Sequence, residues 1–530
     1  MTKKSQNKSE KRFQWIALGI VLVFTAVLFG RSLDNEILYG WDDGEYITDP
    51  AVRSFDVEEI FTRPFLGMYQ PIAVVTLAWN YHTSGENPVP YHSANLLLHL
   101  INTLLVYLLI RRMTGRIDTS VLISLLFAIH PMHVESVTWI ATRSNLVYSF
   151  FYLLALIFYL RYLETKKWYL YLAVFVLFVL ACFSKVTAIT LPVLLWLFDY
   201  YNERKRSFAV ILEKIPMLLI SLAFGLIAVH YAGQFGHIKE LSEDYNIFDR
   251  LILLAYSIVF YIVKFFAPAH LSAVYAFPLK EGSFLPGVYY FGAFLFIVLA
   301  FNVVILGKSR KTVVFGLLFF LITIGPVLPL QWSRMLMLAD RYTYLPYLGL
   351  FYMVARLYIR LIETEAERIY KYRIFINTGI FFYLLFLIIT TYNRTEVWRD
   401  TETLVNDVIA KERGPADMAI GHFFRGNLYD MKGQPEKALQ DFSRAIELNP
   451  KYTVAYNNRG IVNGMLGNYQ AALNDFNKAI ELNPEYADAY YNRGNVNYYL
   501  KQFIEACSDW SQAAYLGSPQ AAEIKKKYCK

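Results

Sequence analysis

The chain has 530 residues, of which 56% are hydrophobic, 17% are aromatic and only 18% are charged. Soluble proteins carry about 25% charged residues, so this composition excludes an ordinary soluble domain and indicates a membrane protein. The formal net charge of +8 would suggest a nucleic-acid partner only if the basic residues shared one face, but they form short clusters between apolar runs. We therefore expect no nucleic-acid partner.

The N-terminal part combines a basic tail, residues 1–12, with an apolar run at residues 16–30. This is the layout of a signal sequence, but no small-residue cleavage site follows the run. We expect an uncleaved first membrane span with a cytoplasmic N-terminus.

Basic clusters set the topology of the predicted membrane domain, residues 13–392. Positively charged connections favour the cytoplasm. Five connections carry such clusters: Arg111 to Arg116, Arg161 to Lys167, Arg204 to Arg206, Lys308 to Lys311 and Arg368 to Arg373. Placing all five inside gives about eleven spans and puts the C-terminus outside. This count treats the apolar run 251–266 as an interfacial or re-entrant helix. If the run crosses the membrane instead, the topology assigned to a later segment must also change.

The first outer loop, residues 34–92, contains the stretch "WDDGEY", in which Asp42 and Asp43 follow the first span among aromatic residues. The ordinary interpretation of an acidic outer loop is that its carboxylates are solvated. Here the two acids lie beside the membrane surface, at the level that several other ionisable side chains share. Either acid is well placed to accept a proton from an attacking hydroxyl.

Six further ionisable side chains fall at the same outer level under this topology: His130, His133, Glu135, Arg143, Lys185 and Arg341. Ionisable groups at span ends that face one compartment indicate a functional site. Carboxylates together with Lys and Arg favour a base beside a bound phosphate, as in a lipid-linked sugar phosphate whose leaving group the cations would stabilise. We predict that these six residues bind substrate, with Arg341 and Lys185 at the phosphate.

Other interpretations of these side chains stay open. His130, His133 and Glu135 could hold a metal ion, although the proline between the histidines favours a hydrogen-bonded support for the site. Lys185 could extend its amine to the membrane interface, and Arg143 could pair with Glu135 as structure. We predict no certain cofactor or metal ligand and leave a divalent cation open.

A 34-residue period begins after about residue 400. "AIELNPKYTVAYNNRG" starts at Ala445 and "AIELNPEYADAYYNRG" starts at Ala479. The period and its small-residue pattern predict three tetratricopeptide repeats at residues 417–520, with a linker at 393–416 and a tail at 521–530. Such repeats bind peptides or proteins and carry out no chemistry.

Asn458 and Asn492 occupy equivalent positions one period apart in these repeats. Their amides could bond to the backbone of a protein or peptide acceptor, or they could simply face water. The cysteines Cys182, Cys507 and Cys529 match no disulfide framework and no zinc spacing. Only Cys507 and Cys529 could pair, and we expect all three to be incidental.

Several segments, taken in order, resemble one family: "WDDGEY", "LLFAIHPMHVESVTWIATRSNLVYSFFYLLAL", "FSKVTAITLPVLLWLFDY", "RYTYLPYLG" and then the repeats. The chain resembles, over nearly its whole length, the transmembrane-and-tetratricopeptide-repeat protein O-mannosyltransferases and their bacterial relatives, which are GT-C membrane glycosyltransferases. The resemblance implies a polyprenyl-phosphate-linked sugar donor, an active site on the outer face and a catalytic acid in the first outer loop. That acid falls on Asp42 or Asp43, with Asp42 favoured.

We therefore expect an all-α fold, with a GT-C-like helical membrane domain followed by a tetratricopeptide-repeat solenoid. The expected function is transfer of a sugar, mannose by the resemblance, from a polyprenyl phosphate to a hydroxyl of a protein. We expect a bacterial inner membrane as the location, with the repeats in the periplasm. The alternatives are a non-catalytic scaffold that recruits partners through the repeats, and a transporter of a lipid-linked glycan, which should show inverted repeats or broken helix pairs.

Overall fold

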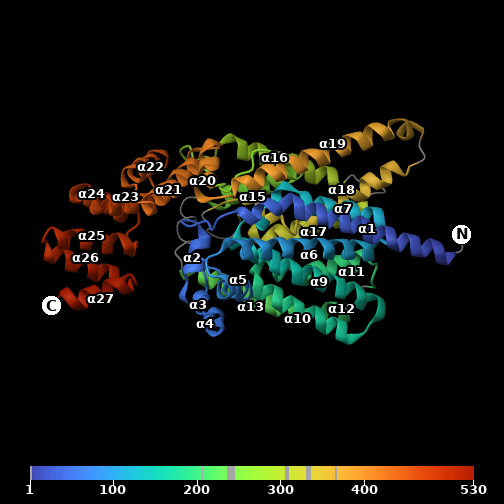
Figure 1. Cartoon of the computed structure of the whole chain (residues 1–530), viewed down its shortest axis with the longest axis horizontal. Coiled ribbons are helices and arrows are strands. Elements are labelled where there is room, and N and C mark those ends of the chain that lie inside the picture. Colours follow the sequence, from blue (N-terminus) through green and yellow to red (C-terminus); the bar gives the residue numbers. More distant parts are fainter. Residues whose placement is uncertain are drawn as a thin grey trace. The chain divides into compact units, whose positions relative to one another are not determined.

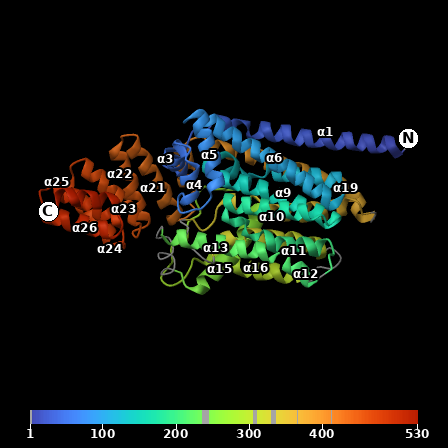
Figure 2. The same cartoon turned by 90° about the horizontal axis from the view of Figure 1, so that it is seen from below.

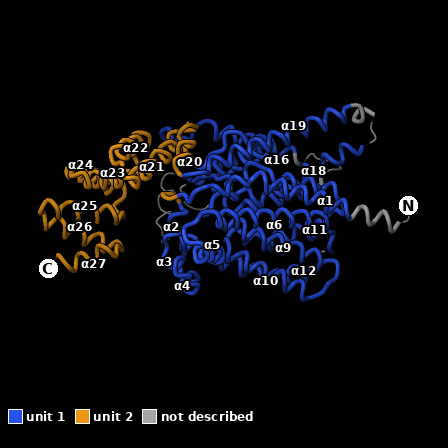
Figure 3. Tube along the Cα trace, in the orientation of Figure 1, with its two compact units in different colours: residues 1–38, 42–273, 280–400 blue, residues 39–41, 274–279, 401–530 orange. Residues whose placement is uncertain are grey.

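The computed structural model of the chain describes residues 3–205, 207–234, 245–304, 310–329, 336–364, 367–411 and 413–529. Within these ranges the secondary structure is helical and no β-strand forms, which confirms the predicted all-α class (Figure 1). The chain divides into two compact units, shown in different colours in Figure 3. Unit 1 contains residues 1–38, 42–273 and 280–400, and unit 2 contains residues 39–41, 274–279 and 401–530.

Unit 1 consists of long helices joined by short helical turns. Its helices are α1 (Lys3–Gly30), α2 (Asp42–Thr48), α3 (Pro50–Arg53), α4 (Val57–Thr62), α5 (Pro71–Ser84), α6 (Pro88–Thr114), α7 (Ile117–Ile129), α8 (Val134–Thr138), α9 (Arg143–Thr165), α10 (Trp168–Ser184), α11 (Leu191–Tyr201), α12 (Phe208–Leu212), α13 (Ile215–Gln234), α15 (Ile247–Phe266), α16 (Gly287–Val304), α17 (Arg310–Ile324), α18 (Tyr347–Ile362) and α19 (Glu367–Val397). The 3-10 turns are η1 (Arg31–Asp34), η2 (Pro131–His133), η3 (Ile140–Thr142), η4 (Val186–Thr190), η5 (Gly325–Val327) and η6 (Asp340–Thr343).

Helix α6 shows how the sequence sets the limits of these helices. The Asn87 side chain caps the first turn by accepting a hydrogen bond from the Val89 N–H at 3.1 Å, and Pro88 occupies the first helical position. The helix ends at Gly115, whose φ of +67° is open to glycine at little cost. Between these signals the run is apolar and long enough to cross a membrane.

Several helices of unit 1 are apolar enough to cross a membrane. Within the described residues, five long segments qualify: Arg12–Asp34, Pro88–Thr114, Ile140–Thr165, Phe208–Gly233 and Tyr372–Val397. The pair Ile117–Ile129 and Pro131–Thr138, bent by 56°, would be a sixth, and four shorter apolar helices lie between residues 168 and 327. The run 251–266 lies in α15, which is not among these segments. The protein is thus a polytopic helical membrane protein, and the count of eleven spans stays a prediction.

The described parts of the predicted cytoplasmic connections meet at one end of unit 1. Arg112 pairs with Glu164 and Arg116 pairs with Glu363, which joins the connections that follow α6, α9 and α18. Lys311, at the start of α17, lies 2.5 Å from Glu203 after α11. Arg206 and Lys308 lie outside the described residues, and so do the side chains of Arg368 and Lys371 in the cluster after α18. Helices α2 to α5 gather at the opposite end (Figure 1 and Figure 2).

Unit 2 contains α20 (Thr401–Ala410), α21 (Pro415–Met431), α22 (Pro435–Leu448), α23 (Thr453–Met465), α24 (Tyr469–Leu482), α25 (Ala487–Tyr499), α26 (Phe503–Tyr515) and α27 (Pro519–Tyr528). The pairs α21–α22, α23–α24 and α25–α26 correspond to the three predicted repeats. The segment expected as a linker, residues 393–416, contains the end of α19 and all of α20.

The repeated residues explain why each helix pair packs closely. A Cβ atom on Gly426 of α21 would lie only 2.7 Å from the ring of Phe442 on α22, so the two helices can approach closely only at a glycine. Arg459 of α23 forms an ion pair with Asp475 of α24 at 2.7 Å, which fixes the second pair in the same way. Because these contacts are local, the 34-residue period predicts them well.

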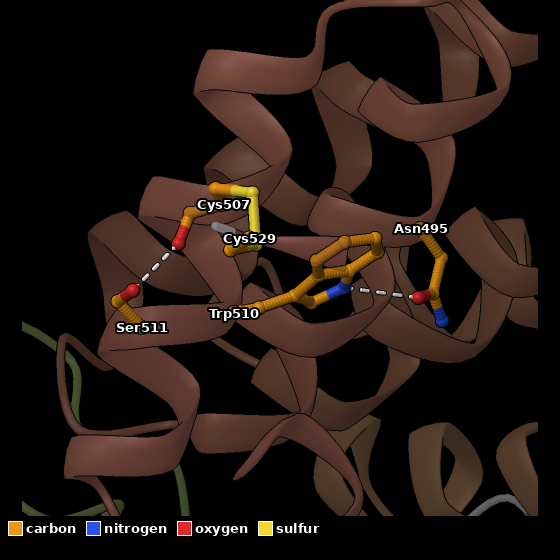
Figure 4. The surroundings of a disulfide bond; sticks show 5 residues. All are labelled: Asn495, Cys507, Trp510, Ser511 and Cys529. Carbon is orange, nitrogen blue, oxygen red and sulfur yellow. Dashed lines mark hydrogen bonds between the residues drawn. A yellow bond between two sulfur atoms is a disulfide. The ribbon is translucent and has the colours of Figure 1, made fainter. Parts of the chain in front are cut away.

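The expectation that all three cysteines are incidental is wrong for two of them. Cys507 on α26 and Cys529 after α27 form a disulfide, with their Cα atoms 5.6 Å apart (Figure 4). Spacing rules miss it because the bridge depends on α27 folding back onto the third repeat, where the Tyr528 ring lies tilted against Trp510 with 6.2 Å between the ring centroids. Cys182 is a buried free thiol.

Candidate active site

The two acids of the first outer loop have different environments. Asp43, in the first turn of α2, is completely buried. Its carboxylate accepts hydrogen bonds from the backbone N–H groups of Leu38 at 3.2 Å and Ala141 at 2.8 Å. Burial raises the pKa of this carboxyl to about 7, although these two hydrogen bonds act in the opposite direction. Asp43 therefore ties the outer loop to η3.

Asp42 begins α2 and is only half-buried. Among the described residues, none donates a hydrogen bond to its carboxylate. Burial raises the pKa of Asp42; the charge of Arg341 lowers it, and the charges of Glu45 and Glu135 raise it further. A carboxylate that is accessible, that no described residue hydrogen-bonds and that is more basic than usual is suited to accept a proton from an attacking hydroxyl.

Arg341 and Glu135 form a buried pair beside Asp42. The Arg341 backbone N–H donates to one Glu135 oxygen at 2.8 Å, and its guanidinium pairs with the other oxygen. The side chain of Glu135 is only 1% exposed, whereas that of Arg341 keeps 17% exposure. The Arg341 guanidinium also lies over the rings of Trp139 and Tyr342, at 5.2 and 5.1 Å. Glu135 therefore fixes the direction of this cation.

The remaining donors of Arg341 are available to a ligand. Within the part of the chain that the structure describes, no side chain or carbonyl accepts a hydrogen bond from its Nε or Nη2 atoms. Burial lowers the pKa of this guanidinium, but the charges of Glu135, Tyr342 and Asp42 and the hydrogen bond to Glu135 together outweigh burial and raise it. Arg341 is thus a permanent cation with free donors, which is the property that recognises an anionic phosphate.

Lys185 lies between α10 and η4, and its amine donates to the side-chain oxygen of Asn145 on α9. The Asn145 amide in turn lies 3.5 Å from the hydroxyl of Ser136, the residue after Glu135. The sequence interpretation missed Asn145, although it follows Arg143 in the stretch "ATRSN". The sequence did contain a signal for Asn145, because it is a polar residue close to a basic residue at the end of a predicted span.

Arg143 differs from Arg341 because the protein accepts hydrogen bonds from all its guanidinium nitrogens. Its Nε donates to Asn95 at 2.8 Å, Nη2 donates to the Tyr91 carbonyl at 2.8 Å, and Nη1 donates to the Thr76 carbonyl and to the Asn80 side chain. The residue is 1% exposed. This environment indicates that Arg143 joins α5, α6 and α9 as structure. Four of its five guanidinium N–H groups donate within the protein, which leaves one, on Nη2, for the predicted contact with substrate.

His130 and His133 are completely buried near the bend between α7 and α8. His130 hydrogen-bonds with the Phe265 carbonyl at 3.1 Å, and His133 hydrogen-bonds with the Phe127 carbonyl at 2.8 Å. Glu135 contacts neither and faces Arg341. Among the described residues, no group of three His, Cys, Asp or Glu side chains is arranged to hold a metal ion.

The repeat asparagines form a chain of amides across three helices. Asn458 on α23 donates to Asn427 on α21 at 2.9 Å, and Asn492 on α25 donates to Asn457 on α23 at 3.1 Å. Asn457 also donates to Asn458 at 3.2 Å. Each of these amides keeps one N–H beyond the bond it donates here. They are therefore oriented by one another, and a contact with a partner stays a prediction.

Comparison with known protein families supports the class that the fold and the site suggest. Residues 71–232 match the family described as dolichyl-phosphate-mannose-protein mannosyltransferase. Residues 419–452 match the tetratricopeptide repeat, and residues 465–500 match a second tetratricopeptide-repeat family. The mannosyltransferase match contains Glu135 and Lys185 but not Asp42 or Arg341, so the site extends beyond it.

Similar proteins among curated sequences are protein O-mannosyl-transferases. The chain is 25% identical over 471 residues to F38B6.6 of Caenorhabditis elegans, covering 84% of this chain and 64% of that protein. It is 24% identical over 498 residues to TMTC1 of Homo sapiens, covering 82% and 55%. Tmtc1 of Drosophila melanogaster is 32% identical over 141 residues, covering 27% and 16%. The predicted resemblance is confirmed: the chain is a relative of these transferases and spans up to about two thirds of their length.

Among solved structures, the first tetratricopeptide-repeat domain of Spaghetti (RPAP3), bound to the HSP90 peptide SRMEEVD, is similar to part of the chain. The two share 26% identity with a TM-score of 0.20, covering 21% of this chain and 89% of that one. The Arabidopsis OM64 repeat domain gives 26% identity and a TM-score of 0.21, covering 22% and 98%.

Proposed function

We propose that the chain is a membrane glycosyltransferase that moves a sugar from a polyprenyl-phosphate-linked donor to a hydroxyl of a protein, with mannose as the sugar. The observation that carries the proposal is that Asp42, whose carboxylate no described residue hydrogen-bonds, feels the charge of Arg341, whose Nε and Nη2 donors no described group accepts. The mannosyltransferase match and the related O-mannosyl-transferases support the same reaction class.

In the proposed reaction the acceptor hydroxyl attacks the anomeric carbon of the sugar. The new bond joins this carbon to the acceptor oxygen, and the bond from the carbon to the phosphate oxygen breaks. The hydroxyl proton passes to Asp42, and the electron pair of the broken bond stays on the departing polyprenyl phosphate. Arg341 stabilises the charge that grows on this leaving group, because its direction is already fixed by Glu135. Lys185 is a second cation for the phosphate in this proposal.

The repeats supply the acceptor site in this proposal. The chain of amides at Asn427, Asn457, Asn458 and Asn492 would bond to the backbone of an extended peptide through its remaining donors and acceptors. Such contacts recognise peptide geometry without reading side chains, which suits an enzyme that modifies many proteins.

We place the active site and the repeats on the extracytoplasmic face of the membrane. Two observations support this side: the basic connections gather at the end of unit 1 opposite α2 to α5, and the repeats carry a disulfide. Disulfides persist in oxidising compartments such as the bacterial periplasm. A membrane-impermeant reagent should label a cysteine introduced at an exposed repeat position in intact cells, after permeabilisation of any outer membrane. Labelling only after lysis would contradict this topology.

Donor binding to Arg341 tests the proposed site most sharply. The double change Arg341→Gln and Glu135→Gln removes the cation without leaving Glu135 as an unpaired buried charge. Because a charge-assisted hydrogen bond contributes about 1.5–3 kcal/mol, the affinity for a polyprenyl-phosphate sugar in nanodiscs should fall at least about tenfold. Binding of an acceptor peptide should change less than about twofold. Arg112→Gln, which removes a partly exposed ion pair with Glu164 among the basic connections, is the control. Equal losses for donor and acceptor would contradict the assignment.

A further inference from the structure

We propose that the surface between α24 and α26 of the repeat unit carries a binding site for a carbohydrate, a pyranose ring with its hydroxyl groups. A cavity of about 440 Å³ opens there, lined by residues of α24, α25 and α26. Ligand pockets of this size are lined mainly by apolar side chains, whereas most side chains in this one are polar. The cavity lies wholly within unit 2, and its lining contains none of the four asparagines of the amide chain.

The floor of the cavity, formed by Arg493, Asn497 and Asp509, keeps donors and acceptors for a ligand. Asp509 is 5% exposed and accepts hydrogen bonds from Arg493 at 2.6 Å and from the Asn497 amide at 3.0 Å. Three of the five Arg493 N–H groups donate to Asp509 or Asn477, which leaves two. Asn497 is 7% exposed, and no described residue donates to its side-chain oxygen. The floor therefore offers both N–H donors and an amide oxygen.

The rim of the cavity adds a carboxylate and an apolar surface. Glu505 is exposed in the first turn of α26, and no described residue forms an ion pair or hydrogen bond with its side chain. Ile504 beside it is 84% exposed, and Leu473 lines the cavity from α24. The Asn477 side chain accepts a hydrogen bond from Arg493 at 2.6 Å and keeps its own amide N–H groups. Polar and apolar groups thus border one space.

The preceding pair of repeats shows which of these residues the repeat architecture itself requires. One period of 34 residues earlier the floor recurs, because Arg459 and the Asn463 amide both donate to Asp475, at 2.7 and 3.2 Å. The rim does not recur, since the position of Glu505 holds Ala471 there. The floor is therefore part of how the repeats pack. The rim carboxylate is particular to the cavity between α24 and α26.

A carbohydrate suits this combination of groups better than an anion does. A pyranose has neighbouring hydroxyls, each both a donor and an acceptor, and a face made of C–H groups. In the proposed complex the Glu505 carboxylate accepts two hydroxyls, and the Asn477 amide donates to a third. The C–H face of the ring lies against Ile504. A phosphate is disfavoured because the lining holds two carboxylates, Glu505 and Asp509, and a single cation, Arg493.

The test titrates methyl α-mannoside into the full-length protein in nanodiscs and follows binding by ligand-observed NMR. A ligand of this size in an open polar site should bind with a Kd of about 1 mM. Glu505→Ala should weaken binding at least about tenfold and Asn477→Ala about three- to tenfold, because each removes hydrogen bonds to the sugar. Ser443→Ala is the matched control, since Ser443 accepts from Arg459 as Asn477 accepts from Arg493. It should change the affinity less than about twofold.

The measurement requires no turnover, so it does not depend on the proposed transferase reaction. Asp42→Asn should leave the sugar affinity unchanged, and an equal loss in that variant would place the sugar at the candidate active site and overturn the proposal. No saturable binding up to about 10 mM would also overturn it, as would unchanged affinity in both Glu505→Ala and Asn477→Ala. A peptide of serine and threonine without sugar should not compete with methyl α-mannoside. Competition by this peptide would make the cavity a peptide site instead.

Discussion

Asp42 and Asp43 are adjacent, yet the structure predicts opposite consequences for their substitution. Asp42 accepts no hydrogen bond from the described residues, and burial raises its pKa by more than the charge of Arg341 lowers it, so its charge is on balance unfavourable in the fold. Asp42→Asn should leave the unfolding temperature unchanged or slightly higher. The same change removes the base, which typically contributes about 10² to 10⁴ in rate. We therefore expect a fully folded protein whose sugar transfer falls by two to four orders of magnitude.

Asp43→Ala should instead destabilise the outer loop. It removes the acceptor of two buried backbone N–H groups, those of Leu38 and Ala141. Each unsatisfied buried donor costs about 1–3 kcal/mol, so the loss is about 2–6 kcal/mol. The assay pairs thermal unfolding of the purified protein in detergent with the initial rate of transfer in liposomes. Normal transfer by Asp42→Asn, or equal destabilisation by the two variants, would refute this division of roles.

Three other changes test separate parts of the structure. Glu45 raises the pKa of Asp42, so Glu45→Gln should lower that pKa and move the acid limb of the pH–rate profile to lower pH; Glu58→Gln should leave the profile in place, and a shift to higher pH would contradict this reasoning. Arg143→Lys cannot reproduce the hydrogen bonds of a planar guanidinium, so chemical denaturation should show a loss of at least about 3 kcal/mol, and a stable variant would disprove its structural role. Cys507→Ser opens the disulfide loop and should cost the repeats about 3 kcal/mol, seen as a thermal shift that reduction of the wild type reproduces; no shift in either would show that the bridge is dispensable.

Local patterns in the sequence predicted the repeats well and the disulfide poorly. The 34-residue period specifies helix pairs because each pair packs through contacts within one repeat, such as Gly426 against Phe442. The bridge between Cys507 and Cys529 depends on where the last helix folds back, and no short spacing encodes that. The pattern of charge likewise placed the basic connections at one end of unit 1, but it could not determine the number of spans.

The sequence predicted which residues of the candidate site share one depth in the membrane domain, but not which of them form ion pairs with one another. Charge topology put Asp42, Glu135 and Arg341 at the same depth, since each follows or precedes an apolar run. It could not show that Glu135 pairs with Arg341, because the partners are 206 residues apart in the chain. Nor could it separate Arg341 from Arg143, which uses four of its five N–H donors because four acceptors on neighbouring helices converge on it. Three-dimensional packing decides which of two similar cations is free.

The central claim is that this chain itself transfers a sugar from a lipid phosphate to a hydroxyl, with Asp42 as the base. The most direct measurement uses the purified full-length protein in liposomes with a radiolabelled polyprenyl-phosphate mannose and a peptide that contains serine and threonine. Glycopeptide and released polyprenyl phosphate are quantified together. The wild type should form both in equal amounts, and Asp42→Asn should form neither above background. Formation of neither product by the wild type with both substrates bound, or equal formation by both proteins, would contradict the account.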